Sequence, residues 1–345
     1  SWRSSKDYKK EKVDKKMKEE EIRKRDVFDK YLELVEKDVN DFFNFSLFEQ
    51  VFCPACGSED YQIEFVKLGF SYVLCRKCST LFVNPRPPSF ILDKFYSSSP
   101  STEFWVKEFF MPVAEARREK VFRPRAEQIS KLVRKPSGNI IGDIGAGFGL
   151  FLEELKKLLP DNDYYAIEPS RLMVDILNMK GLKVIDKTFE NMEGYNSFFD
   201  VLTAFELMEH IHNPGIFLQK VYTSLRPGGF FLLTTLNGKG FDILLLWEKS
   251  KSVSPPHHLN FFNPLSIKTL LEKIGFNEIE ITTPGKLDWD IVEGMILRDG
   301  VDLGRFWNLI ARELGIKEKM ALQKWIAENN LSSHMMVIAK KPLSA

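Results

Sequence analysis

The fold of this chain is decided by the stretch Ile140-Ile141-Gly142-Asp143-Ile144-Gly145-Ala146-Gly147-Phe148-Gly149. A short apolar run ends in an acid, and glycines then follow at every second position. Residues 150–159 place apolar side chains at helical spacing. This order predicts a strand, a tight turn and a helix, because glycine lets a backbone turn sharply and approach a ligand with no Cβ in the way. Leu150 replaces the last glycine of the dinucleotide fingerprint G-x-G-x-x-G, so the turn is not that motif.

A second acidic residue follows the glycine turn about 20 residues later. Tyr164-Tyr165-Ala166-Ile167-Glu168 is a short apolar segment that ends in a carboxylate. An acid about 20 residues past the glycines is where α/β nucleotide sites hold ribose hydroxyls. We expect Glu168 in that role, with the N-cap of a helix starting near Pro169-Ser170 as the alternative.

From residue 140 onward, apolar strand patterns alternate with helical ones, which predicts an α/β fold with a parallel sheet covered on both faces. The strands are expected at 140–144, 164–168, 182–186, 198–205, 230–236, 276–283 and 335–339, the last one antiparallel. Helices are expected at 170–180, 214–225 and 264–274. Residues 285–330 are rich in apolar and aromatic side chains and predict an inserted helical unit, which either lies over the substrate side or forms a dimer interface or sheet cover.

All four cysteines lie between residues 53 and 78, as Cys53, Cys56, Cys75 and Cys78. The spacing is C-x2-C, eighteen residues, C-x2-C. Two such pairs can complete a tetrahedral Zn²⁺ site, and four protein ligands leave no open position, so the metal would be structural. The alternative is two disulfides, which would need an oxidising compartment.

The composition bounds the function classes. The chain has 345 residues, 44% of them hydrophobic, and a net charge of +1. We expect a cytoplasmic protein, because neither a membrane span nor a signal-peptide pattern is present. Near-neutral charge argues against a nucleic-acid partner. The Lys/Glu-rich N-terminus predicts a solvated helix that docks by its C-terminal half, where apolar residues from Val27 to Val35 recur at helical spacing.

The motif from Asp143 to Gly149 resembles the first motif of class I S-adenosylmethionine (SAM) methyltransferases, D-x-G-x-G-x-G. The segment Phe205-Glu206-Leu207-Met208-Glu209-His210 and the turn Leu225-Arg226-Pro227-Gly228-Gly229 resemble later motifs of that class, in the right order. The resemblance implies a Rossmann-like sheet in the order 3-2-1-4-5-7-6 with SAM at the carboxyl ends of the strands. It assigns to the cofactor Asp143, Gly145, Gly147, Gly149, Glu168 and, against the adenine, Phe205, with Arg125 from an upstream helix on the SAM carboxylate.

A narrower resemblance covers roughly residues 50–340. The cysteine ribbon, the exit Asn84-Pro85-Arg86-Pro87 and the loop Pro255-Pro256-His257-His258 resemble zinc-ribbon-bearing class I methyltransferases related to sugar C-methyltransferases. This implies a small-molecule or glycan acceptor, but the insertion at 285–330 departs from that group, so the substrate is not carried over. The domains expected are a charged helical segment at 1–50, the ribbon at 51–88, a helical cap at 89–135 and the SAM-binding domain at 136–345.

Two hypotheses describe the chemistry. In the first, His257 or His258, stiffened by two prolines, removes a proton from an oxygen or carbon nucleophile, with His210 as the next candidate. In the second, Glu206-x-x-Glu209-His210 and a later histidine resemble the divalent-metal set of small-RNA 3′-end and ubiquinone-pathway O-methyltransferases. These residues would then hold Mg²⁺ or Mn²⁺ against a diol, a catechol or an RNA 3′ end; otherwise Glu209 and His210 only hydrogen-bond within the loop. A non-catalytic SAM-binding module is the remaining alternative.

Overall fold

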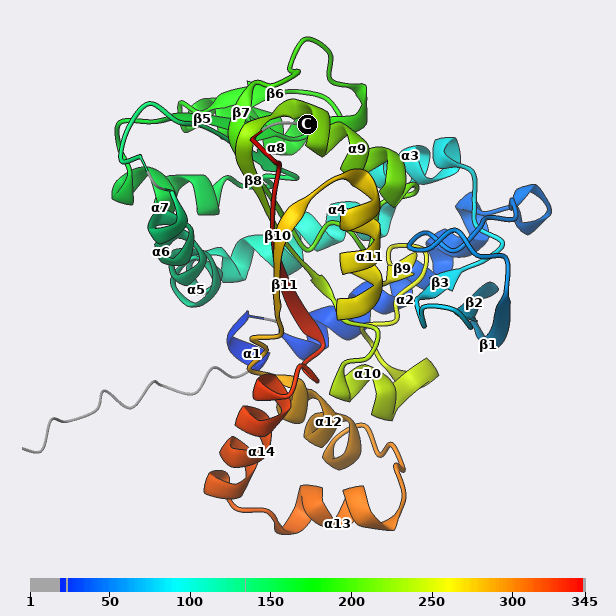
Figure 1. Ribbon diagram of the computed structural model, residues 1–345. Coiled ribbons are helices and arrows are strands. Elements are labelled where there is room, and N and C mark those ends of the chain that lie inside the picture. Colours follow the sequence, from blue (N-terminus) through cyan, green and yellow to red (C-terminus); the bar gives the residue numbers. More distant parts are fainter. Residues whose placement is uncertain (1–18, 23, 134, 344–345) are drawn as a thin grey trace, which may run out of the picture.

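The glycine stretch supplies an inner strand of a seven-stranded, mainly parallel sheet (Figure 1). The computed structural model describes residues 19–343, apart from 23 and 134. The strand order is β10-β11-β8-β7-β4-β5-β6. The strands are β4 (Ile140–Ile144), β5 (Asp163–Ile167), β6 (Lys183–Ile185), β7 (Phe199–Phe205), β8 (Leu225–Leu236), β10 (Asn277–Thr282) and β11 (His334–Lys340). Counted along the chain from β4, this is 3-2-1-4-5-7-6, so the predicted topology is confirmed, and β11 is antiparallel to both neighbours as expected.

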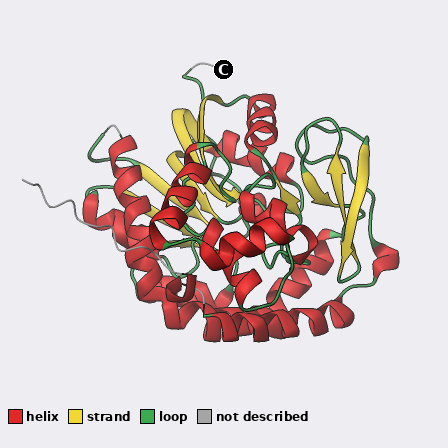
Figure 2. Cartoon of the chain, turned by 90° about the horizontal axis from the view of Figure 1, so that it is seen from below, coloured by secondary structure: helices red, strands yellow, loops and turns green. Residues whose placement is uncertain are grey.

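Helices cover both faces of this sheet (Figure 2). We name the α7 face the one that buries Ile141, Val201 and Leu232 under α6 (Arg123–Leu132), α7 (Leu150–Leu158) and α8 (Arg171–Met179). The α9 face is the opposite one, covered by α9 (Pro214–Ser224) and α11 (Pro264–Ile274). Because both faces are buried, the inner strands are almost continuously apolar, as in the Phe-Asp-Val-Leu-Thr-Ala-Phe sequence of β7.

The cysteine ribbon is joined to the main domain by a strand from far along the chain. Its sheet has the order β1-β2-β3-β9, with β1 (Tyr61–Lys67), β2 (Phe70–Cys75), β3 (Leu81–Val83) and β9 (Asn260–Phe261). In the register, Phe82 pairs with Asn260 and Leu81 with Phe261. Strand β9 directly follows the Pro-Pro-His-His loop, so the ribbon holds the exit of that loop.

The N-terminal helices link the ribbon to the cap. Residues 1–18, which carry most of the predicted Lys/Glu-rich run, lie outside the described residues; the described part begins with α1 (Glu19–Ile22) and α2 (Arg25–Phe42). Phe28, Tyr31 and Val35 of α2 are buried against aromatic residues of the ribbon and cap, which confirms the expected apolar stripe. The cap consists of α3 (Ser89–Ser98), α4 (Pro100–Phe104), α5 (Ala114–Arg117) and α6, with π-helical turns at Trp105–Phe110 and Arg118–Phe122.

The predicted inserted unit is helical, at the bottom of Figure 1. It contains α12 (Asp288–Leu297), α13 (Arg305–Glu313) and α14 (Ile316–Glu328), and its buried Trp289 packs in one cluster with Leu246 of α10 (Phe241–Leu246). Asp288 accepts hydrogen bonds from the Ser332 hydroxyl at 2.8 Å and the Ser333 N–H at 2.6 Å, which attach the unit to the start of β11. None of the helices in the described ranges combines the length and apolar character needed to cross a membrane.

Candidate active site

The glycine turn and the second acid meet as the sequence predicted. Gly145, Gly147 and Gly149 all have positive φ, and Gly149 is the N-cap of α7. The Glu168 carboxylate accepts hydrogen bonds from the Gly147 N–H at 2.9 Å and from the Ser170 N–H at 3.0 Å. It therefore faces the glycine turn and also accepts from the N-cap residue of α8, Ser170, while its expected contact with ribose hydroxyls stays a prediction.

Asp143 lies buried at the end of β4, next to the same turn. The Thr203 hydroxyl of β7 donates a 2.6 Å hydrogen bond to its Oδ1. Burial raises the pKa of Asp143 to about 7, although the Thr203 hydrogen bond and the Arg125 charge both favour the ionised form. The structure thus brings Asp143 and Arg125 within electrostatic reach of each other.

Arg125, from α6, points at the end of β7. Its Nη2 donates to Glu206 Oε1 at 3.0 Å, and its guanidinium carbon lies 4.8 Å from the centre of the Phe205 ring. His334 Nε2 lies 3.3 Å from the same Nη2, and His334 Nδ1 lies 3.4 Å from Glu206 Oε1. Burial works against ionisation of Glu206, but His334 when protonated, the Arg125 charge and the hydrogen bond from Thr234 hold its pKa at about 2.

Glu209, His210 and His258 converge on the α9 face of the sheet. One possible ligand atom from each lies within 4.8 Å of the others. The Thr235 hydroxyl donates to Glu209 Oε2 at 2.7 Å, and Glu209 is buried. Burial, reinforced by the Glu206 charge, raises the pKa of Glu209 to about 8. Burial also lowers the pKa of His210 well below its usual range, with the neighbouring histidines adding to the effect.

The hydrogen bonds around the two imidazoles assign their tautomers. His258 Nδ1 lies 2.6 Å from the Ser252 carbonyl oxygen, so it carries the proton and, in the neutral ring, Nε2 carries the lone pair. The Tyr96 hydroxyl donates to the His257 carbonyl at 3.4 Å, so its oxygen accepts from His210 Nδ1 at 3.3 Å. Both rings therefore keep a lone pair on Nε2, the state needed of a ligand or a base.

His257 does not belong to this cluster, although it is adjacent in sequence to His258 and its ring centre lies 6.2 Å from that of His210. Its ring packs 4.9 Å from Phe95, 5.4 Å from Tyr96 and 5.8 Å from Tyr31, measured between ring centres. Its Nε2 is buried and makes no hydrogen bond to any described residue. Burial lowers its pKa to about 3, with a smaller contribution from His258. The structure thus gives the two neighbouring histidines different surroundings, which the sequence could not separate.

The four cysteines gather at one point of the ribbon. One Sγ ligand atom from each lies within 4.8 Å of the others, and the pairs Cys53–Cys78 and Cys56–Cys75 are separated by 3.5 Å and 3.6 Å. All four are free thiols rather than disulfides. Zn–S bonds of about 2.3 Å at tetrahedral angles place two sulfurs about 3.8 Å apart. The donor set therefore fits a four-thiolate zinc ion.

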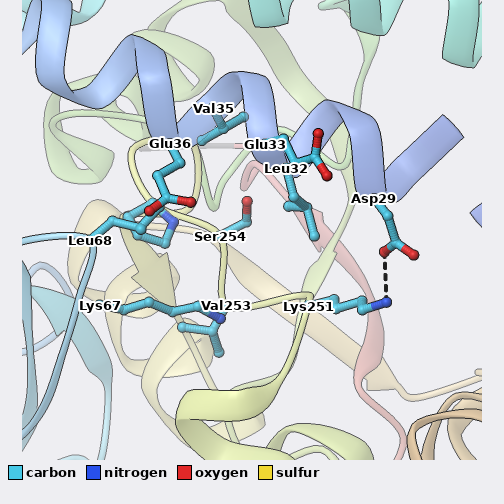
Figure 3. A pocket seen from close by; sticks show the side chains of 11 residues that line it. Asp29, Leu32, Glu33, Val35, Glu36, Lys67, Leu68, Lys251, Val253 and Ser254 are labelled. Atoms are coloured by element: carbon cyan, nitrogen blue, oxygen red, sulfur yellow. Dashed lines mark hydrogen bonds and ion pairs between the residues drawn. The ribbon is translucent and has the colours of Figure 1, made fainter. Parts of the chain in front are cut away.

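A cavity of about 370 Å³ lies on the other side of the histidine loop, between α2, the β1–β2 turn and residues 251–255 (Figure 3). Asp29 and Lys251 form a 2.7 Å ion pair across its edge. Lys67, whose pKa is lowered to about 8 by burial, donates to the Ser250 carbonyl at 2.8 Å. None of the predicted cofactor or catalytic residues lines this cavity, so it is not the cofactor site assigned above.

A family model described as "Methyltransferase domain" matches residues 114–281, which include the second part of the cap, the glycine turn and the Glu209–His210 segment. The chain carries a SAM-dependent methyltransferase domain. This chain is 30% identical over 150 residues to a ubiquinone biosynthesis O-methyltransferase of a Bradyrhizobium species, covering 37% of this chain and 58% of the relative. The rat mitochondrial ubiquinone biosynthesis O-methyltransferase is 32% identical over 157 residues, covering 41% and 45%. The chain thus spans about half the length of these two relatives.

Other proteins similar to this chain have no assigned substrate or a different one. An uncharacterized protein of Methanocaldococcus jannaschii is 22% identical over 196 residues, covering 57% of this chain and 91% of its own. Among solved structures, the complex of the Haloferax volcanii Trm112 activator with a putative methyltransferase is similar with a TM-score of 0.49 and 14% identity, covering 69% of this chain and 96% of that one. A possible histamine N-methyltransferase of Thermotoga maritima has a TM-score of 0.44 and 16% identity, with coverages of 69% and 97%.

Sequence reasoning missed several residues that position the site. Tyr96, Thr234, Thr235 and His334 each contact a predicted site residue, yet none belongs to a motif. Arg86, fully buried, donates to the His212 carbonyl at 2.6 Å and to Asn260 Oδ1 at 3.2 Å, and so connects the ribbon exit to the loops of the site. Its place in the Asn-Pro-Arg-Pro exit was the available signal.

Proposed function

We propose that this chain is an O-methyltransferase that transfers the SAM methyl group to a small molecule with two neighbouring hydroxyls, such as a diol or catechol. The observation that carries the proposal is the convergence of Glu209, His210 and His258, three groups from two distant segments of the chain. The similarity to relatives named ubiquinone biosynthesis O-methyltransferases supports oxygen as the methyl acceptor. The expected kinship with sugar C-methyltransferases stays a prediction.

A divalent cation fits the three side chains. The set offers one carboxylate and two imidazoles, with the Nδ1 hydrogen bonds to Ser252 and Tyr96 fixing the ring orientations in the way that metal-bound histidines require. Carboxylate and water ligands suit Mg²⁺ and Mn²⁺, and imidazole suits Zn²⁺, so a set with one carboxylate and two imidazoles favours a transition metal over Mg²⁺. When bound, such a cation supplies Lewis acidity to an acceptor hydroxyl.

The residues of the chain orient the reactants. The sulfonium methyl group needs a nucleophile held in line with the departing sulfur, and positioning of this kind can supply about 7–11 kcal/mol of the barrier. Asp143, Gly147 and Glu168 would hold the cofactor at the ends of β4 and β5, while Glu209 and His210 follow the end of β7 in the chain. His258 would use its Nε2 lone pair in one of two ways, either to bind the metal or to remove the proton of the acceptor hydroxyl.

The alternative is a metal-free enzyme in which His258 alone is the general base and the acceptor is a glycan precursor or a carbon nucleophile. The same Ser252 hydrogen bond that orients a ligand would orient a base, so this alternative shares the geometry. It differs in its dependence on Glu209, which a metal-free base does not need.

The test compares Glu209→Gln, His258→Ala and wild type in transfer of the SAM methyl group to a catechol panel, with and without Mn²⁺ or a chelator. Metal assistance predicts that both variants lose activity and that chelation abolishes wild-type turnover, with Mn²⁺ restoring it. Full activity of Glu209→Gln in the presence of chelator would rule out the metal and leave the base alternative. Transfer of the methyl group to carbon only would refute the O-methyltransferase proposal.

For the ribbon, we propose one structural Zn²⁺ held by Cys53, Cys56, Cys75 and Cys78. The support is the four-sulfur cluster and the absence of an open ligand position in such a set. Because β9 pairs with β3, the ion would also stabilise the exit of the histidine loop. Metal analysis of purified protein tests this: one zinc per chain is expected, and two disulfides would contradict it.

A further inference from the structure

Two adjacent threonines of β8 each bind a different glutamate of the Glu206-x-x-Glu209 motif. The Thr234 hydroxyl donates to Glu206 Oε1 at 2.6 Å, and the Thr235 hydroxyl donates to Glu209 Oε2 at 2.7 Å. Successive side chains of a strand point to opposite faces of its sheet. Leu232, two residues before Thr234, is buried on the α7 face, and Leu233, two residues before Thr235, is buried on the α9 face.

The two glutamates therefore belong to different faces. Glu209 joins His210 and His258 on the α9 face, whereas Glu206 is held on the α7 face with Arg125 and His334. The strand register agrees, because His334 of β11 pairs with Leu236, which lies on the same face of β8 as Thr234. Glu206 also has a positive φ of 51°, an uncommon conformation for a residue other than glycine, which turns the chain at the end of β7.

Arg125 and Glu206 form an ion pair that is only partly buried. The Arg125 side chain is 10% exposed, but that of Glu206 is 33% exposed. The contacts of Glu206 with Arg125, Thr234 and His334 all fall on Oε1, and within the described residues no hydrogen bond reaches Oε2. His334 Nε2 accepts from Arg125, so in the neutral ring its proton is on Nδ1, which faces Glu206. The neutral imidazole thus lies against both charges without adding one.

We propose that Glu206, together with Arg125, binds the amino-acid end of the cofactor, with the guanidinium on the α-carboxylate and the Glu206 carboxylate on the α-ammonium. The proposal rests on SAM being the cofactor, and its new element is Glu206. A zwitterion entering between two opposite charges leaves every charge paired, which is the condition for burying charged groups. The pair lies beside the glycine turn, because Arg125 acts electrostatically on Asp143 and packs on Phe205 at the end of β7.

Two compounds related to the cofactor can distinguish binding of its amino-acid end by Glu206 from a metal-binding or purely structural role of Glu206. S-adenosylhomocysteine carries the amino-acid end, and 5′-methylthioadenosine has the same nucleoside and sulfur without it. Calorimetric binding of both compounds is measured for wild type, Glu206→Gln and the matched variant Glu209→Gln, with Mn²⁺ binding as a second readout. Arg125→Gln provides a second variant of the same pair if Glu206→Gln does not fold.

Loss of a hydrogen bond to a charged group corresponds to about a 10- to 100-fold change in affinity. We expect Glu206→Gln and Arg125→Gln to weaken the affinity for S-adenosylhomocysteine by that factor. Both variants should keep the affinity for 5′-methylthioadenosine within about twofold of the wild-type value. Glu209→Gln should change neither affinity. Three results for Glu206→Gln would overturn the assignment: equally weakened affinity for both compounds, unchanged affinity for both, or loss of Mn²⁺ binding. A wild-type chain that binds neither compound would instead overturn the cofactor on which it rests.

Discussion

Two glycines of one turn should respond to the same substitution in different ways. Gly147 and Gly149 have φ of 52° and 71°, so alanine at either position adopts a left-handed conformation that costs about 1–2 kcal/mol. A Cβ on Gly147 meets no atom within 4 Å, whereas one on Gly149 would lie 2.7 Å from Leu177 and 2.8 Å from Leu182, both buried in the core. Overpacking of this kind costs a further 1–3 kcal/mol or so.

We therefore expect Gly149→Ala to reduce the free energy of unfolding by roughly 2–5 kcal/mol and Gly147→Ala by about 1–2 kcal/mol. The space beside Gly147 is where the cofactor should approach, so Gly147→Ala, and more strongly Gly147→Val, should lose S-adenosylhomocysteine binding while staying folded. Urea unfolding followed by calorimetry on the folded variants measures both quantities. Equal destabilisation of the two alanine variants would refute the packing argument, and undiminished binding by Gly147→Val would refute the cofactor site.

Three further predictions concern the cap, the ribbon and the histidine loop. Glu154 of α7, whose pKa is held at about 2 by hydrogen bonds from Lys157 and two arginines despite burial, should contribute up to about 3 kcal/mol of stability. This contribution is complete above its unfolded pKa of 4.5 and is lost as the pH falls through 2, so Glu154→Gln should lower the melting temperature at pH 7 and by roughly a quarter as much at pH 2.5; a constant difference across pH would contradict it. Chelation or Cys53→Ser should increase amide hydrogen exchange over residues 50–85 and in β9, but leave S-adenosylhomocysteine affinity nearly intact; unchanged exchange would argue against zinc. His258→Ala should lower turnover at least about a hundredfold, whereas His257→Ala should mainly reduce thermal stability; the reverse pattern would assign the reactive ring to His257.

The positions of the strands and the glycine turn could be predicted from local patterns, whereas the strand order followed from the resemblance to class I methyltransferases. Apolar runs buried on both faces, glycines with positive φ and Gly275 at the end of α11 are all visible in the sequence. The convergence of Gly147 and Glu168 followed from the rule that ligands bind at the carboxyl ends of parallel strands.

The arrangement of side chains in the site could not be predicted, because it depends on packing between distant segments. The sequence places Glu206 and Glu209 in one motif, but Thr234 and Thr235 hold them on opposite faces of the sheet. His257 and His258 differ only because one packs against aromatic residues and the other bonds to the Ser252 carbonyl. Strand β9 has two residues, too few for any periodicity.

The most direct test of the proposed acceptor site is a crystal structure of the full chain with S-adenosylhomocysteine and Mn²⁺, with anomalous data collected for manganese. We predict an anomalous peak bounded by Glu209, His210 and His258, beside a cofactor whose adenosine lies at Glu168 and whose amino-acid end lies between Arg125 and Glu206. A fully bound cofactor with no manganese peak at these three residues, or a peak coordinated by Glu206 in place of Glu209, would contradict the account.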